Sequence, residues 1–215
     1  PMTILYYYAG ACSLVPHIVA RELGLDINTV AAPRPDDAGR YEYLDKINAL
    51  GKVPALRLDD GTVITQNIAI VEYLAALGEA AGKVDVVYPK LGTLAHAQAL
   101  RWLSFASSDL HPAFRPLFRP QLFTKSETDF QMIKDIATDV VLDLMAHVDG
   151  EYLQRDAIAN NQYSAADIYI YVTYRWASRL GLDLSPYSGL KKMIAAIQTR
   201  PAVLKALEEQ NQPLI

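Results

Sequence analysis

The sequence LYYYAGACSLVPH at residues 5–17 changes from a strand pattern to a helix pattern across a short loop. Aromatic and β-branched residues predict a strand over 3–8, and small residues at 9–11 predict the loop. Ser13 has a side chain suited to capping the helix that follows, which we expect to reach about Leu23. The start of the chain therefore reads as a strand, a tight loop and a helix.

A second strand pattern follows that helix. Pro16 lies in the first helical turn, where its missing N–H has no acceptor within the helix, and Gly24 is a natural stop. The pattern of residues 27–31 predicts a second strand. Because two strands joined through a helix by short connections favour a right-handed parallel crossover, this segment predicts a βαβ unit.

The segment after the βαβ unit predicts the remainder of a small sheet. The expected elements are a loop at 33–39, a helix at 41–47, strands at 53–58 and 63–65, and a helix at 68–77. Asp60 and Gly61 between the last two strands predict a two-residue hairpin turn. The order β, α, β, α, β, β, α predicts a mixed sheet flanked by helices.

From Leu91 onward no convincing strand pattern remains, and apolar residues recur at helical spacing. The expected helices are one from 94 that Pro112, Pro116 and Pro120 kink or end, then 129–148, 165–180 with a Ser164–Asp167 capping box, 190–200, and one from Pro201. The helix at 129–148 should bury one face, comprising Ile133, Ile136, Val140, Leu144 and Val148. This part predicts an all-α bundle of about five helices.

The composition is that of an ordinary globular protein, with 51% hydrophobic and 20% charged residues in 215. A net charge of −4 gives no basic surplus for nucleic acid or an anionic membrane, so we expect neither partner. Cys12 is the only cysteine, which excludes an intramolecular disulfide and a multi-cysteine metal site. No secretory signal or apolar run of bilayer length is visible, so we expect a cytoplasmic protein.

Two positions in the first part suggest chemistry at sulfur. Cys12 lies at the first turn of a predicted helix, where free N–H groups and the helix dipole favour a thiolate. The alternative is that Cys12 is a small buried apolar residue. Pro54 must lie at a strand start or edge, and a cis Val53–Pro54 bond would leave the Val53 amide and carbonyl free for an extended peptide ligand. A routine trans proline is the alternative.

Two further positions suggest ligand binding. Gln66 and Asn67 precede a predicted helix, where their amides and free N–H groups converge on a site for a carboxylate; simple capping by Asn67 explains the pattern equally well. His111 lies at a predicted helix break, and its imidazole can be neutral or charged near pH 7 and bond a thiol or substrate. A structural histidine is the alternative. Metal-like spacing and nucleotide motifs are absent, so we expect no metal and no nucleotide.

These features together resemble the cytosolic glutathione S-transferases, most closely the bacterial beta class, over nearly the whole chain. The resemblance is carried by the quoted segment at 5–17, GKVPAL at 51–56, TQNIAI at 65–70 and SAAD at 164–167. It implies an α/β thioredoxin-like N-terminal domain over 1–80 and an all-α C-terminal helical bundle over 90–215. It also implies a homodimer that binds glutathione as cosubstrate in a cleft between the two domains.

The resemblance implies roles for individual residues. Cys12 and His111 would be catalytic, with Cys12 contacting the glutathione sulfur or forming a mixed disulfide with it, and His111 lying near the thiol. Glutathione would be bound by Cys12, Arg34 at the glycyl carboxylate, Val53 and Pro54 at the cysteinyl backbone, Gln66 and Asn67 at the γ-glutamate, and Ser104.

Three positions and one loop depart from the family pattern. The loop at 33–39 differs from the basic segment that meets the glycyl carboxylate, and Arg34 would be its substitute there. Gln66 replaces a common Glu, so an ionic contact with the γ-glutamyl amine becomes a neutral hydrogen bond, roughly half as strong. Pro112 stands where the beta class places Lys after the histidine, and Ser104 stands where Asn is common. These departures bear on how tightly glutathione is bound and how its thiol is stabilised.

Three functions agree with this pattern. The first is conjugation, in which the glutathione thiolate attacks a hydrophobic electrophile, as in detoxification. The second is glutathione-dependent thiol–disulfide exchange or reductive dehalogenation through Cys12, which has no CxxC partner and so follows a monothiol route. The third is a non-catalytic protein of the same fold that binds apolar ligands.

Overall fold

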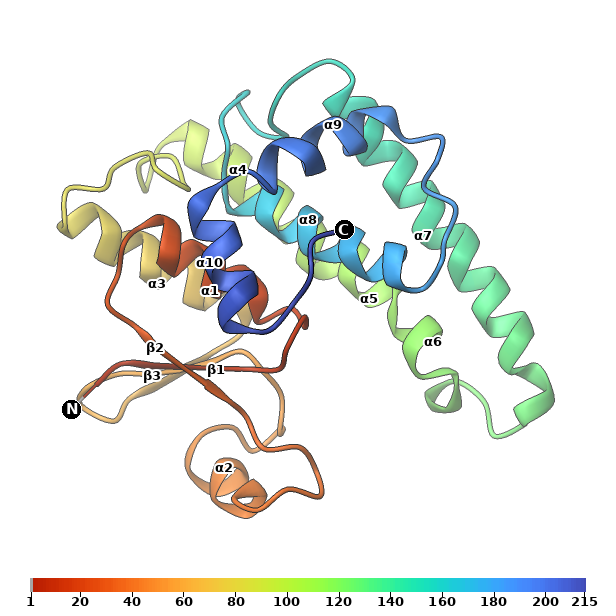
Figure 1. Ribbon diagram of the computed structural model, residues 1–215, viewed down its shortest axis with the longest axis horizontal. Coiled ribbons are helices and arrows are strands. Elements are labelled where there is room, and N and C mark those ends of the chain that lie inside the picture. Colours follow the sequence, from red (N-terminus) through yellow and green to blue (C-terminus); the bar gives the residue numbers. More distant parts are fainter. Residues whose placement is uncertain (1) are drawn as a thin grey trace.

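The computed structural model describes residues 2–215, and its first half is built on a four-stranded sheet with the order β2-β1-β3-β4 (Figure 1). The strands are β1 (Ile4–Tyr7), β2 (Asn28–Ala31), β3 (Ala55–Arg57) and β4 (Val63–Thr65). β2 runs parallel to β1, while β3 is antiparallel to both β1 and β4. The predicted βαβ unit and mixed sheet are therefore confirmed.

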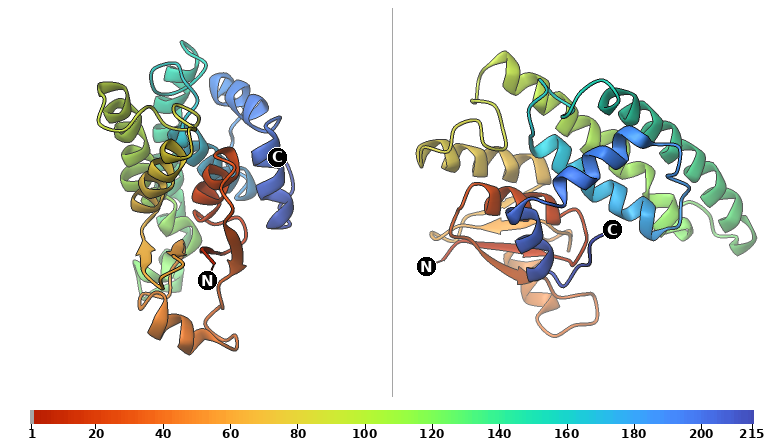
Figure 2. Two further views of the ribbon diagram at one scale, coloured as in Figure 1. Left: turned by 90° about the vertical axis from the view of Figure 1, so that its left-hand side faces the viewer. Right: turned by 45° about the horizontal axis from the view of Figure 1, so that its top comes forward.

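Helices cover both faces of this sheet. α1 (Leu14–Glu22) and α3 (Asn67–Ala80) pack together on one side, and α2 (Arg40–Lys46) lies on the other (Figure 1). α1 buries almost its whole surface, because α3, α8 and α10 all contact it. In both views of Figure 2 the C-terminal helix α10 (Pro201–Glu209) lies beside α1. The last helix of the chain thus completes the core of the first half.

Two local expectations in the first half are wrong. Ser13 precedes α1 but does not cap it, because its hydroxyl accepts from the Tyr8 amide and donates to the Tyr8 carbonyl. The β3–β4 turn has three residues, since the Leu58 amide still pairs with the Thr62 carbonyl. Gly61 supplies the left-handed conformation that such a turn requires, with a φ of 90°.

The second half is helical, as predicted. Its α-helices are α4 (Leu94–Phe105), α5 (His111–Ala113), α6 (Arg115–Phe118), α7 (Phe130–Tyr152), α8 (Ala165–Arg179), α9 (Ser188–Ile197) and α10. A π-helical turn at Ala106–Leu110 joins α4 to α5. The number of elements exceeds the expected five because Pro112 and Pro116 each lie in the first turn of a separate short helix.

The buried face of α7 differs from the predicted one. Of the predicted face, Val148 is buried and Ile133 and Leu144 are half-buried, but Ile136 and Val140 are 60% and 45% exposed. Ala137, Val141 and Met145 are buried in their place. The sequence places two adjacent apolar rows on this helix. Packing against α6 and α9 buries the row that contains Ala137, Val141 and Met145. Met132, Ile136 and Val140 consequently form an exposed apolar stripe at four-residue intervals.

The Ser164–Asp167 capping box is present at the start of α8. The Asp167 carboxylate is 1% exposed and accepts from the Ser164 and Ile158 amides, both at 2.8 Å, and from the Tyr152 hydroxyl at 2.6 Å. Nearly every residue of α8 is buried, since α1, α4 and α9 pack around it. This helix therefore fixes the second half against α1.

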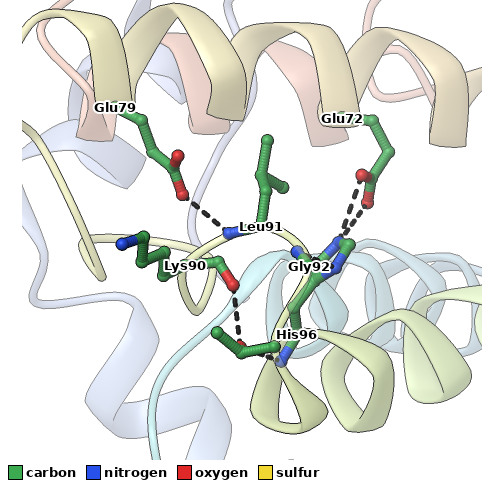
Figure 3. A network of polar contacts seen from close by, with 7 residues as sticks. Glu72, Glu79, Lys90, Leu91, Gly92 and His96 are labelled. Atoms are coloured by element: carbon green, nitrogen blue, oxygen red, sulfur yellow. Dashed lines mark hydrogen bonds and ion pairs between the residues drawn. The ribbon is translucent and has the colours of Figure 1, made fainter.

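The segment between α3 and α4 is bonded to both helices (Figure 3). The Leu91 amide donates to Glu79 at 2.7 Å, and His96 Nε2 lies 3.1 Å from both carboxylate oxygens of Glu72. His96 Nδ1 accepts from the Gly92 amide, so the neutral ring carries its hydrogen on Nε2 and donates it to Glu72.

Among residues 2–215 no helix has the length and apolarity of a membrane span.

Candidate glutathione site

Cys12 occupies the loop before α1, opposite the start of β3. Its Sγ lies 3.5 Å from the Val53 carbonyl, to which the thiol donates. The Val53–Pro54 bond is cis, as suggested by the sequence. Of the two Val53 backbone groups expected to be free, the carbonyl is bonded to this thiol. Within residues 2–215 the Val53 amide donates no hydrogen bond. A thiol and an open backbone donor therefore lie side by side.

The Cys12 thiol is protonated at neutral pH, contrary to the expected thiolate. Burial raises its pKa from 9.0 to about 11. The amides of Cys12 and Ser13, the Asn67 side chain and the Lys52 charge all act to lower the pKa, but they do not offset the loss of solvation. A helix start alone is insufficient to ionise a sulfur so enclosed.

Residues of the second half of the chain form hydrogen bonds to the loop that carries Cys12. Gly10 donates its amide to Gln210 Oε1 at 3.0 Å and accepts from Trp176 Nε1 at 2.8 Å. Gly10 has a φ of 71°, and a Cβ there would come within 2.6 Å of Gln212 Oε1. Gln210, which directly follows α10, also bonds the ring of His17 at 2.9 Å and so links this loop to α1.

The start of α3 separates Gln66 from Asn67. Gln66 is exposed, with a φ of 76°, and precedes the helix. Asn67 is 8% exposed and does not cap the helix, because its Nδ2 donates to the Cys12 carbonyl at 3.1 Å and to the Tyr169 hydroxyl at 3.4 Å. Its Oδ1 is buried without a partner in residues 2–215. Capping by Asn67 is therefore excluded.

His111 begins α5, directly after the π-helical turn. Its Nδ1 lies 2.7 Å from the Tyr169 hydroxyl, and its ring meets Trp176 edge-on at 4.8 Å between centroids. Burial, assisted by the Lys52 charge, lowers the pKa of His111 from 6.5 to about 4. The expectation that both charge states are accessible near pH 7 is wrong, since the imidazole is neutral there.

Aromatic side chains extend from His111. Phe114 and Phe118 lie 5.5 and 5.9 Å from Trp176, between ring centroids. Phe114 is fully buried and packs in the core, whereas Phe118 is 50% exposed. Only the outer part of this cluster is open to an apolar ligand.

The other two predicted residues lie outside the hydrogen-bonded group of Cys12, Asn67, Tyr169 and His111. The guanidinium of Arg34 is exposed and rests on the Tyr8 ring, 4.5 Å from its centroid. Ser104 on α4 makes no hydrogen bond to the group within residues 2–215; its carbonyl accepts from Ser108.

The sequence interpretation missed three residues of this region. Tyr169 joins Asn67 to His111, Ser107 contacts the Tyr169 hydroxyl, and the Lys52 charge acts on both Cys12 and His111. Lys52 was detectable by its place next to Val53. Tyr169 was not, because it is one of many apolar or aromatic residues on α8.

The neutrality of His111 should affect stability in acid. Because the pKa of His111 is lower in the folded protein, the unfolded chain takes up this proton at a higher pH on acidification. The free energy of unfolding therefore has its full value above about pH 6.5 and falls between pH 6.5 and 4. The difference between the two pKa values corresponds to a loss of about 3 kcal/mol. We expect His111→Gln to show a shallower decline in urea midpoints over this range. Equal slopes for the wild type and His111→Gln would contradict the assignment.

Comparison with known proteins identifies the family. The model of the glutathione S-transferase N-terminal domain matches residues 9–77. The chain is 32% identical to glutathione S-transferase GST-4.5 of Xanthomonas campestris, over 96% of this chain and 98% of that one. The chain belongs to the glutathione S-transferase family.

Solved glutathione S-transferases share the whole fold. A sphingomonad glutathione S-transferase complexed with glutathione is 36% identical, with a TM-score of 0.83 over 98% of this chain and all of that one. A bacterial beta class glutathione S-transferase from Sphingomonas chungbukensis is 34% identical, with a TM-score of 0.82 over 96% and 98% of the two chains. The expected thioredoxin-like sheet followed by a helical bundle is confirmed.

Proposed function

We propose that the protein is a glutathione transferase that conjugates the glutathione thiolate to hydrophobic electrophiles. The observation that carries this proposal is the open Val53 amide beside a protonated Cys12 thiol. A peptide backbone can pair with Val53 and bring its own sulfur to Cys12. Because Cys12 is a poor nucleophile in this state, the sulfur that reacts is that of glutathione.

The remaining proposed contacts follow the tripeptide. Val53, aligned by Pro54, pairs with the cysteinyl backbone. Gln66 and Asn67, at the start of α3, hold the γ-glutamyl end, where free helical N–H groups favour a carboxylate. Arg34 is the cation for the glycyl carboxylate, and Ser104 completes the set from α4.

The proposed reaction needs no group other than the two substrates. The S–H bond of glutathione breaks and its proton leaves to solvent. The Cys12 amide at the start of α1, the Lys52 charge and His111 stabilise the thiolate. The sulfur then forms a bond to an electrophilic carbon, and the leaving group departs with the electron pair of its former bond. The exposed face of Phe118 is available to an apolar substrate.

Calorimetric titration of glutathione into the reduced protein tests the binding step. We expect a free energy of about −4 to −8 kcal/mol, corresponding to micromolar to millimolar affinity. Absence of heat, together with an unchanged melting temperature, would contradict both enzymatic functions and favour a protein that only binds apolar ligands.

Cys12→Ala separates conjugation from thiol–disulfide exchange. We expect the variant to retain conjugation of an activated aryl chloride within about tenfold, because Cys12 is not the nucleophile. Reduction of a glutathione mixed disulfide, if the wild type performs it, should be lost, since that route requires Cys12. Equal loss of both activities would contradict the conjugation mechanism.

We also infer a homodimer, a division of the chain into domains at 1–80 and 90–215, and a location in the cytoplasm. The exposed stripe of Met132, Ile136 and Val140 supports self-association, because a second copy would remove it from water. The division lies where α3 ends and before α4 begins. A single free cysteine and the use of glutathione agree with a reducing compartment.

A further inference from the structure

The Tyr169 hydroxyl lies between two nitrogens, and their chemistry determines where its hydrogen points. Asn67 Nδ2 approaches it at 3.4 Å and His111 Nδ1 at 2.7 Å. The orientation of the Asn67 amide is fixed independently, since the same Nδ2 lies 3.1 Å from the Cys12 carbonyl, which can only accept. Nδ2 is therefore a donor, and the Tyr169 oxygen accepts from it.

The hydroxyl hydrogen is then directed to His111. An imidazole nitrogen without hydrogen is a strong acceptor, and the 2.7 Å separation is the shorter of the two. Ser107 also contacts this hydroxyl, but a serine can donate or accept and so imposes no direction. If Nδ1 accepts, the single hydrogen of the neutral ring is on Nε2.

We propose that Tyr169 is a positioning residue that holds His111 as its Nε2–H tautomer, so that the imidazole presents a hydrogen-bond donor, and not a base, to the glutathione sulfur. This inference rests on the proposed function. The neutrality of the buried ring agrees with it, because a protonated ring could not accept at Nδ1. His111 keeps its hydrogen throughout, and the thiol proton of glutathione leaves to solvent.

The tautomer can be observed directly in the wild-type protein. Long-range ¹⁵N–¹H spectra distinguish the two ring nitrogens of each of the four histidines, and the signals of His111 are those missing in His111→Gln. We expect the Nε2–H form at pH 7. An Nδ1–H form, or a mixture of the two, would overturn the proposal without any need for a Tyr169 variant to fold.

Tyr169→Phe tests the consequence for the sulfur. Its matched control is Tyr171→Phe, which removes the same atom from the same helix; that hydroxyl accepts from Arg175 instead. Ultraviolet absorbance of the thiolate gives the pKa of bound glutathione. We expect Tyr169→Phe to raise it by about one unit and to lower kcat about tenfold at pH 6.5, with KM for glutathione unchanged within about twofold. Tyr171→Phe should leave all three values unchanged.

A double-variant cycle completes the test. The Gln side chain in His111→Gln has a fixed amide donor and no tautomer, so adding Tyr169→Phe to it should change kcat by less than about twofold. An equal loss of kcat in both backgrounds would show a merely structural role for Tyr169. If wild type binds glutathione but Tyr169→Phe leaves the thiol pKa unchanged, this inference fails alone; if wild type does not bind it, the proposed function fails.

Discussion

Asp167→Ala is expected to lower the free energy of unfolding by about 3–5 kcal/mol, a large part of the total for a domain. The carboxylate is almost fully buried and accepts from the Ser164 and Ile158 amides and the Tyr152 hydroxyl. Alanine would leave these three donors, and the Ser164 hydroxyl that donates to the same carboxylate at 3.2 Å, without this acceptor. Urea unfolding followed by circular dichroism measures the loss, and little or no folded protein would agree with the upper end of this range.

Asp183→Ala is the matched control for this substitution. Asp183 also accepts from a backbone amide and a hydroxyl, both of Ser185, but in an exposed turn where water replaces the carboxylate. We expect a change of less than about 1 kcal/mol there. Equal shifts of the urea midpoint in the two variants would show that the burial of Asp167 is not what makes it important.

The Cys12 thiol is expected to react with iodoacetamide about a hundredfold more slowly at pH 7.5 than in the urea-unfolded chain. The reactive species is the thiolate, and raising the pKa from 9.0 to about 11 reduces its fraction by that factor. Mass spectrometry measures the rate without ambiguity, because the chain has no other cysteine.

The pH dependence separates this electrostatic effect from simple shielding. A shielded thiol of ordinary pKa reacts slowly, but its rate still levels off near pH 9. In the folded protein the rate should continue to rise about tenfold per pH unit beyond pH 9, while in the unfolded chain it levels off. Circular dichroism at each pH checks that the fold persists. A plateau at or below pH 9 in the folded protein would refute the raised pKa.

The sequence predicted those parts of the fold whose signals are local. Ser164 and Asp167 form their capping box within one helical turn, and Gly24 ends α1 by its own backbone preference. Such features need no knowledge of distant contacts. The order of strands and helices follows from many such signals acting together.

The errors lie where packing between distant segments decides. Ser13 has a capping side chain, but the Tyr8 backbone competes for it successfully. On α7 the sequence shows two apolar rows equally clearly, and the packing of the neighbouring helices determines that Ala137 is buried and Ile136 is exposed. The pattern of residue types alone does not predict which row is buried or which partner a capping side chain binds.

In the candidate site too, local signals were predicted from the sequence, whereas features that depend on distant contacts were not. Cys12, Val53, Asn67 and His111 were identified as candidates, but their charge states and partners were not. The pKa of Cys12 depends on how much of the chain encloses it, and that of His111 on burial between α5 and α8. Tyr169 carries no signal of its own, because its role exists only once Asn67 and His111 meet it in space.

The contact between Gln210 and Gly10 joins two residues that are 200 positions apart in the sequence and so leave the ribosome at very different times. The sheet and α1 can form from residues already synthesised, but the loop behind Cys12 receives its last hydrogen-bond acceptor only when α10 is made. The loop behind Cys12 therefore reaches its final shape only after every element up to α10 has been synthesised. A chain that lacks Gln210 lacks the acceptor for the Gly10 amide in this reactive loop.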